Sequence, residues 1–557
     1  MLSRRLFVGG ASAAAFALAG RLDALAADHG LDVALINANV WTGRIGAPRA
    51  DAIGILGDRI VALGSGAVRQ RITRSTRVID LQGAFAMPAF TDGHTHFLRG
   101  AKNLVEPDLL DVRSKDEFVA AIGRAAKARP GKWMLGGPWD EQRMGGVLPS
   151  HDWIDAVTPD TPVAIPRTDL HSYFLNAVAL RLAGITRDTP DPAGGQIVRD
   201  ARGNPTGVIK DNAKLLIDRI VPPLSDAETD AIMRGGIAHG LSKGVGQVHN
   251  PEIDWTVYPS LRRLHAAGPM DMRFYAFVPI ADWERMAKIV AEEGRGDDWL
   301  RWGACKALAD GSLGARTALL YEPYTDVPSQ QGVRVTSLAN LREWIGQSDA
   351  HGLHVATHAI GDRANDDILD IYEAVAAANG PKDRRFRIEH AQHLRPSTIP
   401  RFARQKVIAS MQPYHAIDDG RWAVKRIGEK RLKGTYAFKS MIDSGATVAF
   451  GSDWPVAPLD PLTGVYAAIT RRTIDGANPD GWLPDQKITA EQALHGYTAA
   501  NAYSGFMEDR TGYLAPGYYA DIAVFDADLT AIDPLKIPNV KTLHTFVGGK
   551  QRFTAGA

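Results

Sequence analysis

The stretch FAMPAFTDGHTH, residues 85–96, joins an apolar run to two histidines separated by one residue, His94 and His96. On a β-strand, residues two apart face the same side of the sheet. Both imidazoles can therefore reach one metal ion from the carboxyl end of this strand, where the active sites of parallel barrels are built. Neutral imidazole is a suitable ligand for zinc and similar divalent ions. The stretch predicts a metal site at a strand end.

Three further apolar runs end in a metal-binding type of residue. HVATHAIGD, RIEHAQ and VAFGSDWP place His358, His390 and Asp453 where a strand-like run gives way to glycine or polar residues. Each of these histidines, taken singly, is also explained as a polar residue with its hydrogen bonds satisfied. Four histidines and an aspartate that all follow predicted strands indicate a common metal centre.

The middle of the chain alternates apolar, strand-like runs with amphipathic helical stretches such as residues 364–380. This alternation is typical of βα units and a parallel sheet. About eight repeats favour an α/β fold of the closed, TIM-like (β/α)8 type over an open sheet. No Gly-x-Gly-x-x-Gly fingerprint opens a helix after the first strand, which argues against dinucleotide binding. The candidate strands are 163–167, 244–249, 273–280, 302–310, 352–359, 385–391, 406–413 and 446–453.

The two chain ends have a different texture, with short β segments separated by glycine-containing turns. Neither end alone supplies enough strands for a stable sheet. We therefore expect residues 28–87 and 506–557 to form one small β-sandwich domain beside a barrel at 88–505. The region from about 130 to 210 is rich in Gly, Pro and Trp and fits the barrel pattern poorly. We interpret it as an insertion over the barrel mouth.

The first 27 residues carry an export signal pattern. Ser3, Arg4 and Arg5 precede a short alanine-rich apolar run, and residues 24–26 (Ala-Leu-Ala) fit a small-x-small cleavage site. The pattern resembles a twin-arginine signal peptide, which predicts a periplasmic or secreted protein with no stable membrane insertion after its removal. The run is too short and too weakly apolar to span a bilayer. An uncleaved anchor is the alternative interpretation.

Composition narrows the function classes. With 64 basic and 63 acidic residues the formal net charge is +1, so nothing suggests a nucleic-acid partner. The single cysteine excludes an internal disulfide and a cysteine-rich metal cluster. The chain is 557 residues long and 45% hydrophobic, which is enough for a large core and more than one domain. The remaining expectation is an enzyme with a small-molecule substrate; the sequence leaves a homo-oligomer open.

The motifs together resemble the amidohydrolase superfamily, and within it the branch called amidohydrolase family 3, which includes enzymes such as the N-substituted formamide deformylases. The resemblance covers nearly the whole mature chain. It is carried by PAFTDGHTH, KALADGSLGARTA, HVATHAIGDRA, RIEHAQ, SMQPYHA, GSDWPV and GYLAPGYYADIAVFD.

The resemblance implies two divalent metal ions, with zinc expected and iron, manganese or cobalt equally compatible with the ligand types. One ion is bound by His94 and His96 and the second by His358 and His390. Asp453 holds the first ion, takes the proton of the attacking water and returns it to the leaving nitrogen.

Lys306, in GACKALADG, occupies the place where many family members have a carboxylated lysine that bridges the metals. A neutral amine near two cations can capture carbon dioxide as an anionic carbamate. The alternative is an ordinary lysine paired with Asp310, which would leave room for a single metal.

The resemblance also implies hydrolysis of a non-peptide carbon–nitrogen bond in an N-formyl or N-acyl amine. Related metal barrels hydrolyse esters, lactones and phosphoesters, so the fold does not settle the reaction. A non-catalytic periplasmic binding protein is a further alternative. Residues expected near the substrate are Trp139, His171, Arg316 and His415.

Overall fold

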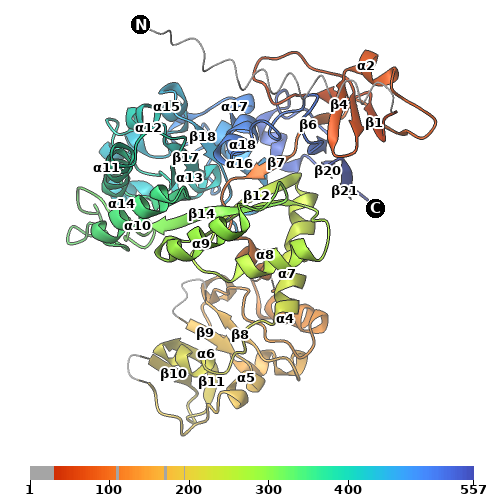
Figure 1. The fold of residues 1–557 in the computed structure, drawn as a ribbon. Coiled ribbons are helices and arrows are strands. Elements are labelled where there is room, and N and C mark those ends of the chain that lie inside the picture. Colours follow the sequence, from red (N-terminus) through yellow and green to blue (C-terminus); the bar gives the residue numbers. More distant parts are fainter. Residues whose placement is uncertain (1–29, 108, 110–111, 168–171, 193–194, 557) are drawn as a thin grey trace. The chain divides into compact units, whose positions relative to one another are not determined.

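The computed structural model describes residues 30–556 apart from 108, 110–111, 168–171 and 193–194. The chain divides into two compact units (Figure 1). The barrel unit contains the described residues up to Phe97 together with those from Ile237 onwards, and the inserted unit is Leu98–Gly236. The predicted signal peptide, residues 1–27, lies outside the described residues.

The barrel unit is built on a sheet of eight parallel strands, in which neighbours in space follow the chain order. The first and last strands meet where Gly93 N–H donates to the Phe450 carbonyl at 3.0 Å and His96 N–H to the Trp454 carbonyl at 2.8 Å. The prediction of a (β/α)8 barrel is confirmed. Its strands are β7 (Phe90–Asp92), β12 (Val245–Pro251), β13 (Arg273–Pro279), β14 (Leu300–Leu308), β15 (His354–Ala359), β16 (Arg387–His390), β17 (Ile408–Met411) and β18 (Val448–Phe450).

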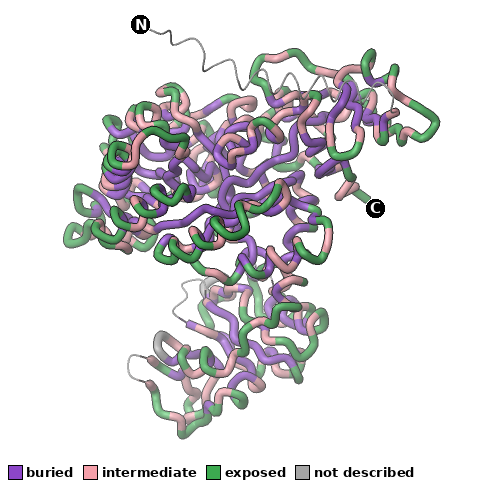
Figure 2. Tube along the Cα trace, in the orientation of Figure 1, coloured by how far each residue is buried: buried purple, intermediate pink, exposed green. Residues whose placement is uncertain are grey.

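Burial explains why these strands were recognisable in the sequence. Strands β12 and β16 are buried at every position, as are most residues of the other barrel strands (Figure 2). Strands of a parallel sheet that are covered on both faces read as continuous apolar runs. Between them lie α8 (Val257–Ala266), α9 (Trp283–Glu293), α10 (Leu338–Ala350), α11 (Asp362–Ala378), α12 (Ile399–Gln405), α13 (Pro413–Asp419), α14 (Ala423–Arg431) and α15 (Phe438–Asp443), and after β18 follow α16 (Pro461–Thr470), α17 (Ala490–Gly496) and α18 (Ala499–Ser504).

The two ends of the chain meet in a pair of small sheets. In one sheet β6 pairs antiparallel with β19, so that Met87 lies opposite Ala523. Side chains from both sheets share one apolar cluster that includes Leu35, Ile55 and Phe546. The sheets contain β1 (Val33–Ile36), β3 (Ile53–Leu56), β4 (Arg59–Leu63) and β5 (Arg77–Asp80) in the first, and β2 (Asn39–Val40), β6 (Phe85–Pro88), β19 (Ile522–Phe525), β20 (Thr542–Val547) and β21 (Lys550–Thr554) in the second; the short helix α2 (Ser65–Arg69) follows β4.

The inserted unit has its own antiparallel sheet in the order β10-β11-β9-β8. The candidate strand at 163–167 is β8 (Ala164–Pro166) of this sheet, so its interpretation as a barrel strand was wrong, and the short β7 takes that place in the barrel. The unit is also wider than the insertion expected at about 130–210, because α4 (Lys115–Ala128) contributes to the same core. Its other elements are β9 (Ser172–Leu175), β10 (Gly195–Arg199), β11 (Pro205–Asp211), α5 (Ala177–Leu182) and α6 (Leu215–Asp218).

The chain positions at which the two units are divided fall within α3 (Phe97–Asn103) and α7 (Asp226–Ser242). Among the helices that the structure describes, none has both the length and the apolar character required to cross a membrane.

Candidate metal centre

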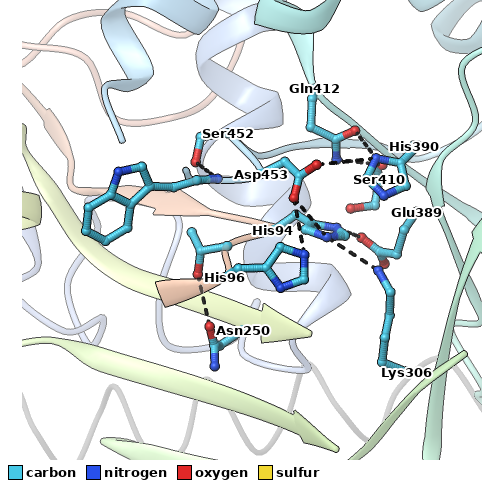
Figure 3. Close-up of polar contacts among 12 residues, drawn as sticks. His94, His96, Asn250, Lys306, Glu389, His390, Ser410, Gln412, Ser452 and Asp453 are labelled. Carbon is cyan, nitrogen blue, oxygen red and sulfur yellow. Dashed lines mark hydrogen bonds and ion pairs between the residues drawn. The ribbon is translucent and has the colours of Figure 1, made fainter. Parts of the chain in front are cut away.

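The predicted metal ligands gather at the carboxyl ends of the barrel strands. Asp453 Oδ1 lies 3.6 Å from His94 Nε2 and 3.4 Å from His96 Nε2. One ligand atom each of His94, His390 and Asp453 lie within 4.8 Å of one another. The His358 ring centroid is 4.5 Å from that of His390. Figure 3 shows the His94, His96 and His390 side chains directed toward the Asp453 carboxylate.

Two of these residues hold an unusual backbone conformation. His390 has φ 77° and Asp453 has φ 62°, in the left-handed region that non-glycine residues rarely adopt. On a regular strand, His390 would face away from the side that its neighbour Glu389 faces. The positive φ at the end of β16 allows both side chains to approach the same centre. Such strain persists where the surrounding structure requires it, typically at functional sites.

Hydrogen bonds fix the orientation of three of the imidazole rings. In His94, His96 and His390 the Nδ1 atom faces an acceptor oxygen, so an Nδ1–H donates and the Nε2 lone pair is left for a metal. The acceptors are Glu389 at 2.5 Å, Glu252 at 3.1 Å and the Gln412 side-chain oxygen at 2.8 Å, respectively.

His358 has the opposite arrangement. Its Nε2 lies 3.1 Å from the Gly311 carbonyl oxygen, which can only accept a hydrogen bond. Nε2 therefore carries the proton in the neutral ring, and Nδ1 is the nitrogen available to a metal. A metal at this centre would therefore find Nε2 without a hydrogen to donate in three rings and Nδ1 in the fourth.

The surroundings keep three histidines of the cluster, His94, His358 and His390, uncharged. Burial and the nearby Lys306 lower the pKa of His94 to about 4 and that of His358 to about 3. Burial and His358 lower the pKa of His390 well below its usual value. At neutral pH these rings are unprotonated at one nitrogen, which is the form that binds a metal.

Lys306 belongs to this cluster. Its side chain comes from β14, is almost fully buried and places Nζ 3.4 Å from His94 Nε2. Burial lowers the pKa of Lys306 to about 8, so a fraction of the amine is neutral near physiological pH.

Asp310 does not act as the partner of this lysine. Its carboxylate instead accepts backbone N–H groups of Leu319 at 2.8 Å, Ile360 at 3.0 Å and Gly361 at 2.8 Å. Asp310 therefore fixes the loops after β14 and β15, and the interpretation of an ordinary Lys306–Asp310 pair is not supported.

A divalent cation fits the residues that are present. Asp453 Oδ1 is buried and has no hydrogen-bond partner among the described residues, although two imidazole Nε2 atoms lie near it. A buried, unpaired carboxylate oxygen is costly unless a cation or a donor compensates it. Imidazole nitrogen and carboxylate oxygen are donors that zinc and similar ions accept.

Several residues around the centre were missed by the sequence reasoning. Glu252, Glu389 and Gln412 orient the ligating rings, and Arg387 pairs with Glu389 through Nε and Oε1 at 2.7 Å. The sequence held one signal for two of them. Arg387 and Glu389 lie two residues apart in RFRIEHA, a strand that is expected to be buried, and charged residues are seldom buried unless they are paired.

The residues expected near the substrate have different surroundings. His415 lies beside the centre, with its ring nearly parallel to that of His390 and the two ring centroids 6.5 Å apart. Trp139 is fully buried in the core of the inserted unit and donates from Nε1 to the Ile165 carbonyl at 3.1 Å; packing accounts for it, which argues against substrate contact. Arg316 is paired with Asp326 at 2.9 Å, and His171 lies outside the described residues.

Known proteins resemble this chain over most of its length. The model of the amidohydrolase family matches residues 77–553. The protein LONG AFTER FAR-RED 3 of Arabidopsis thaliana is 37% identical, covering 94% of this chain and 91% of that protein. The N-substituted formamide deformylase of Arthrobacter pascens is 28% identical, covering 94% and 98%. An uncharacterized metal-dependent hydrolase from Pyrococcus furiosus superposes with a TM-score of 0.73 at 30% identity, covering 89% and 99%.

Proposed function

The chain belongs to the amidohydrolase family, and from this premise we propose that it hydrolyses the carbon–nitrogen bond of a small N-acyl or N-formyl amine. The observation that carries the proposal is the buried Asp453 Oδ1, which faces His94 and His96 and has no hydrogen-bond partner in the part of the chain that the structure describes. The similarity to an N-substituted formamide deformylase supports the choice of bond.

The residues of the centre would have two roles, binding of cations and transfer of a proton. His94, His96 and Asp453 would hold one cation, and His358 with His390 would hold a second. A divalent cation at such a site lowers the pKa of water from 15.7 to about 7 and polarises a carbonyl oxygen. The Asp453 carboxylate accepts the proton of the attacking water and then donates it to the departing nitrogen, which must leave as a neutral amine.

Carboxylation of Lys306 forms part of the proposal. The neutral amine adds to carbon dioxide, a nitrogen–carbon bond forms and one proton leaves, so a neutral side chain becomes an anionic carbamate. Burial favours the neutral amine that this step needs. Native mass spectrometry should then find one carbon dioxide per chain, which is lost on acidification. Its absence in the metal-loaded protein would rule out the carbamate.

The reaction is tested with a panel of N-formyl and N-acyl amines. Esters and an aryl phosphate whose leaving groups carry the same substituents are assayed beside them. We expect the chelator-treated protein to be inactive, zinc to restore activity and the amides to be cleaved. Cleavage of only the aryl phosphate or ester would contradict the choice of a carbon–nitrogen bond. Binding of the compounds with no turnover would indicate a non-catalytic binding protein.

We further propose export to the periplasm or beyond, on the sequence of residues 1–27 alone. Replacing both Arg4 and Arg5 with lysine should leave the precursor in the cytoplasm, whereas the unchanged chain should be recovered outside it. Equal export of both proteins would remove the twin-arginine interpretation.

A further inference from the structure

A buried ion pair lies next to the metal centre, in the interior of the barrel. Arg387 and Glu389 are two residues apart on β16 and both are fully buried. Arg387 donates from Nε to Glu389 Oε1 at 2.7 Å and from Nη2 to Oε2 at 3.1 Å. The same Oε2 receives the Nδ1–H of His94 at 2.5 Å. One carboxylate therefore connects an arginine to a metal ligand. Figure 3 shows the contact of this carboxylate with His94.

Arg387 also contacts the backbone that carries the ligands. Its Nη2 donates to the Gly93 carbonyl at 2.7 Å and to Ser410 Oγ at 3.0 Å, and its Nη1 lies 2.9 Å from His249 Nδ1. Gly93 directly precedes His94 in the chain. Through Glu389 and Gly93, the arginine thus restrains both the ring and the backbone of the first metal ligand.

This arrangement is not explained by stability alone. The interior of a (β/α)8 barrel is commonly filled by branched apolar side chains. Removing two charges from water carries a large desolvation penalty, and well-packed apolar replacements of buried ion pairs are often no less stable. What this charge pair supplies, and apolar packing would not, is a defined orientation for the polar His94 ring beside it.

We propose that Glu389, held by Arg387, is a positioning residue that presets the metal centre before any cation binds. Glu389 accepts from Nδ1–H of His94, which fixes the tautomer and directs the Nε2 lone pair toward Asp453. Arg387 holds Glu389 through two hydrogen bonds and fixes Gly93, so the His94 ring cannot turn away. The inference rests on the proposed metal-dependent function. It names Glu389 and Arg387 as residues that give the centre part of its affinity for metal.

The test compares Glu389→Gln with a matched variant elsewhere in the barrel unit. Asp521 forms an equivalent buried pair with Arg273, through Nε at 2.7 Å and Nη2 at 3.1 Å. Arg273 begins β13, so this pair lies at the amino end of the strands, opposite to the end that carries the ligands. Asp521→Asn therefore removes the same charge from the same kind of pair without touching the centre.

Zinc affinity is measured on metal-free protein by competition with a chromophoric chelator, together with the absorption spectrum of the cobalt-substituted protein. Outer partners of ligating histidines typically contribute a factor of about 10 to 100 in metal affinity. We expect Glu389→Gln to weaken zinc binding by that factor and to alter the cobalt spectrum. Asp521→Asn should lower the melting temperature while leaving both metal readouts unchanged.

Unchanged zinc affinity in folded Glu389→Gln, or an equal loss in Asp521→Asn, would overturn the proposal. If Glu389→Gln does not fold, Arg387→Lys is measured in its place, because lysine keeps the charge but loses the two-point contact. Weakened zinc binding in that variant supports the proposal, and unchanged binding overturns it. Wild-type protein that binds no metal would instead refute the proposed function itself.

Discussion

Replacement of Asp453 by asparagine separates the chemistry of the centre from its fold. Asp453 has φ 62°, and asparagine is among the few residues that tolerate the left-handed region. The side chain keeps its size, and the carboxylate oxygen that is lost has no hydrogen-bond partner within the described part of the chain. We therefore expect Asp453→Asn to fold normally and to melt at or above the temperature of the metal-free wild type.

The loss of activity in this variant should be large. The amide cannot accept the proton of water or return it to the leaving nitrogen, and proton transfer by a positioned side chain contributes a factor of about 10² to 10⁴. That factor corresponds to about 3 to 5 kcal/mol of activation free energy. Metal should be partly retained, because His94 and His96 remain while one anionic ligand is lost.

The assay is kcat on an N-formyl amine at saturating zinc, with metal content and melting temperature measured on the same sample. Asp453→Ala serves as the comparison, because alanine at this φ adds about 1 to 2 kcal/mol of backbone strain. Near-normal turnover of Asp453→Asn would remove Asp453 from proton transfer. A misfolded asparagine variant would refute the argument from the backbone conformation.

Two further predictions concern stability. Burial lowers the pKa of His393 to about 3, so between pH 6.5 and that value the unfolded chain binds a proton that the folded chain does not. The free energy of unfolding should therefore fall as the pH drops. In urea titrations from pH 7 to 5, His393→Asn should flatten this dependence by up to about 1.4 kcal/mol per pH unit. An unchanged slope would contradict the lowered pKa of His393. Trp139→Ala should destabilise the inserted unit by about 3 to 5 kcal/mol, because the indole is part of its apolar core. Hydrogen exchange in α4 and β8 should then be faster. Unaltered exchange there would show that Trp139 does not support this core.

The parts of the site that were predictable are those that depend on local sequence. His358 and His390 could be placed because parallel strands read as apolar runs and their ligands follow directly. The contact of His94 with Glu389 joins residues 295 positions apart, and no local pattern reveals such a pairing. The approach of His390 to the centre likewise depends on a positive φ that nothing in RIEHAQ signals.

The fold was predictable to a similar extent. The alternation of strands and helices indicated the barrel, and the β-rich ends indicated a sheet shared between them. The strand at 163–167 was misplaced because a three-residue buried segment looks the same in a parallel barrel and in a small antiparallel sheet. The sequence also suggests Trp139 as a pocket residue. A Trp-rich stretch does not reveal that this side chain is buried in the core of a separate unit.

The most direct test of the central claim is the metal content of the mature protein and of Lys306→Ala, with hydrolysis of the N-acyl amine panel measured on the same samples. We expect two equivalents of metal in the wild type, fewer in the variant, and activity that falls with the metal. One equivalent in both proteins with undiminished activity would make Lys306 a structural residue and the centre mononuclear. Amide hydrolysis by protein free of metal would contradict the claim that the reaction depends on this centre.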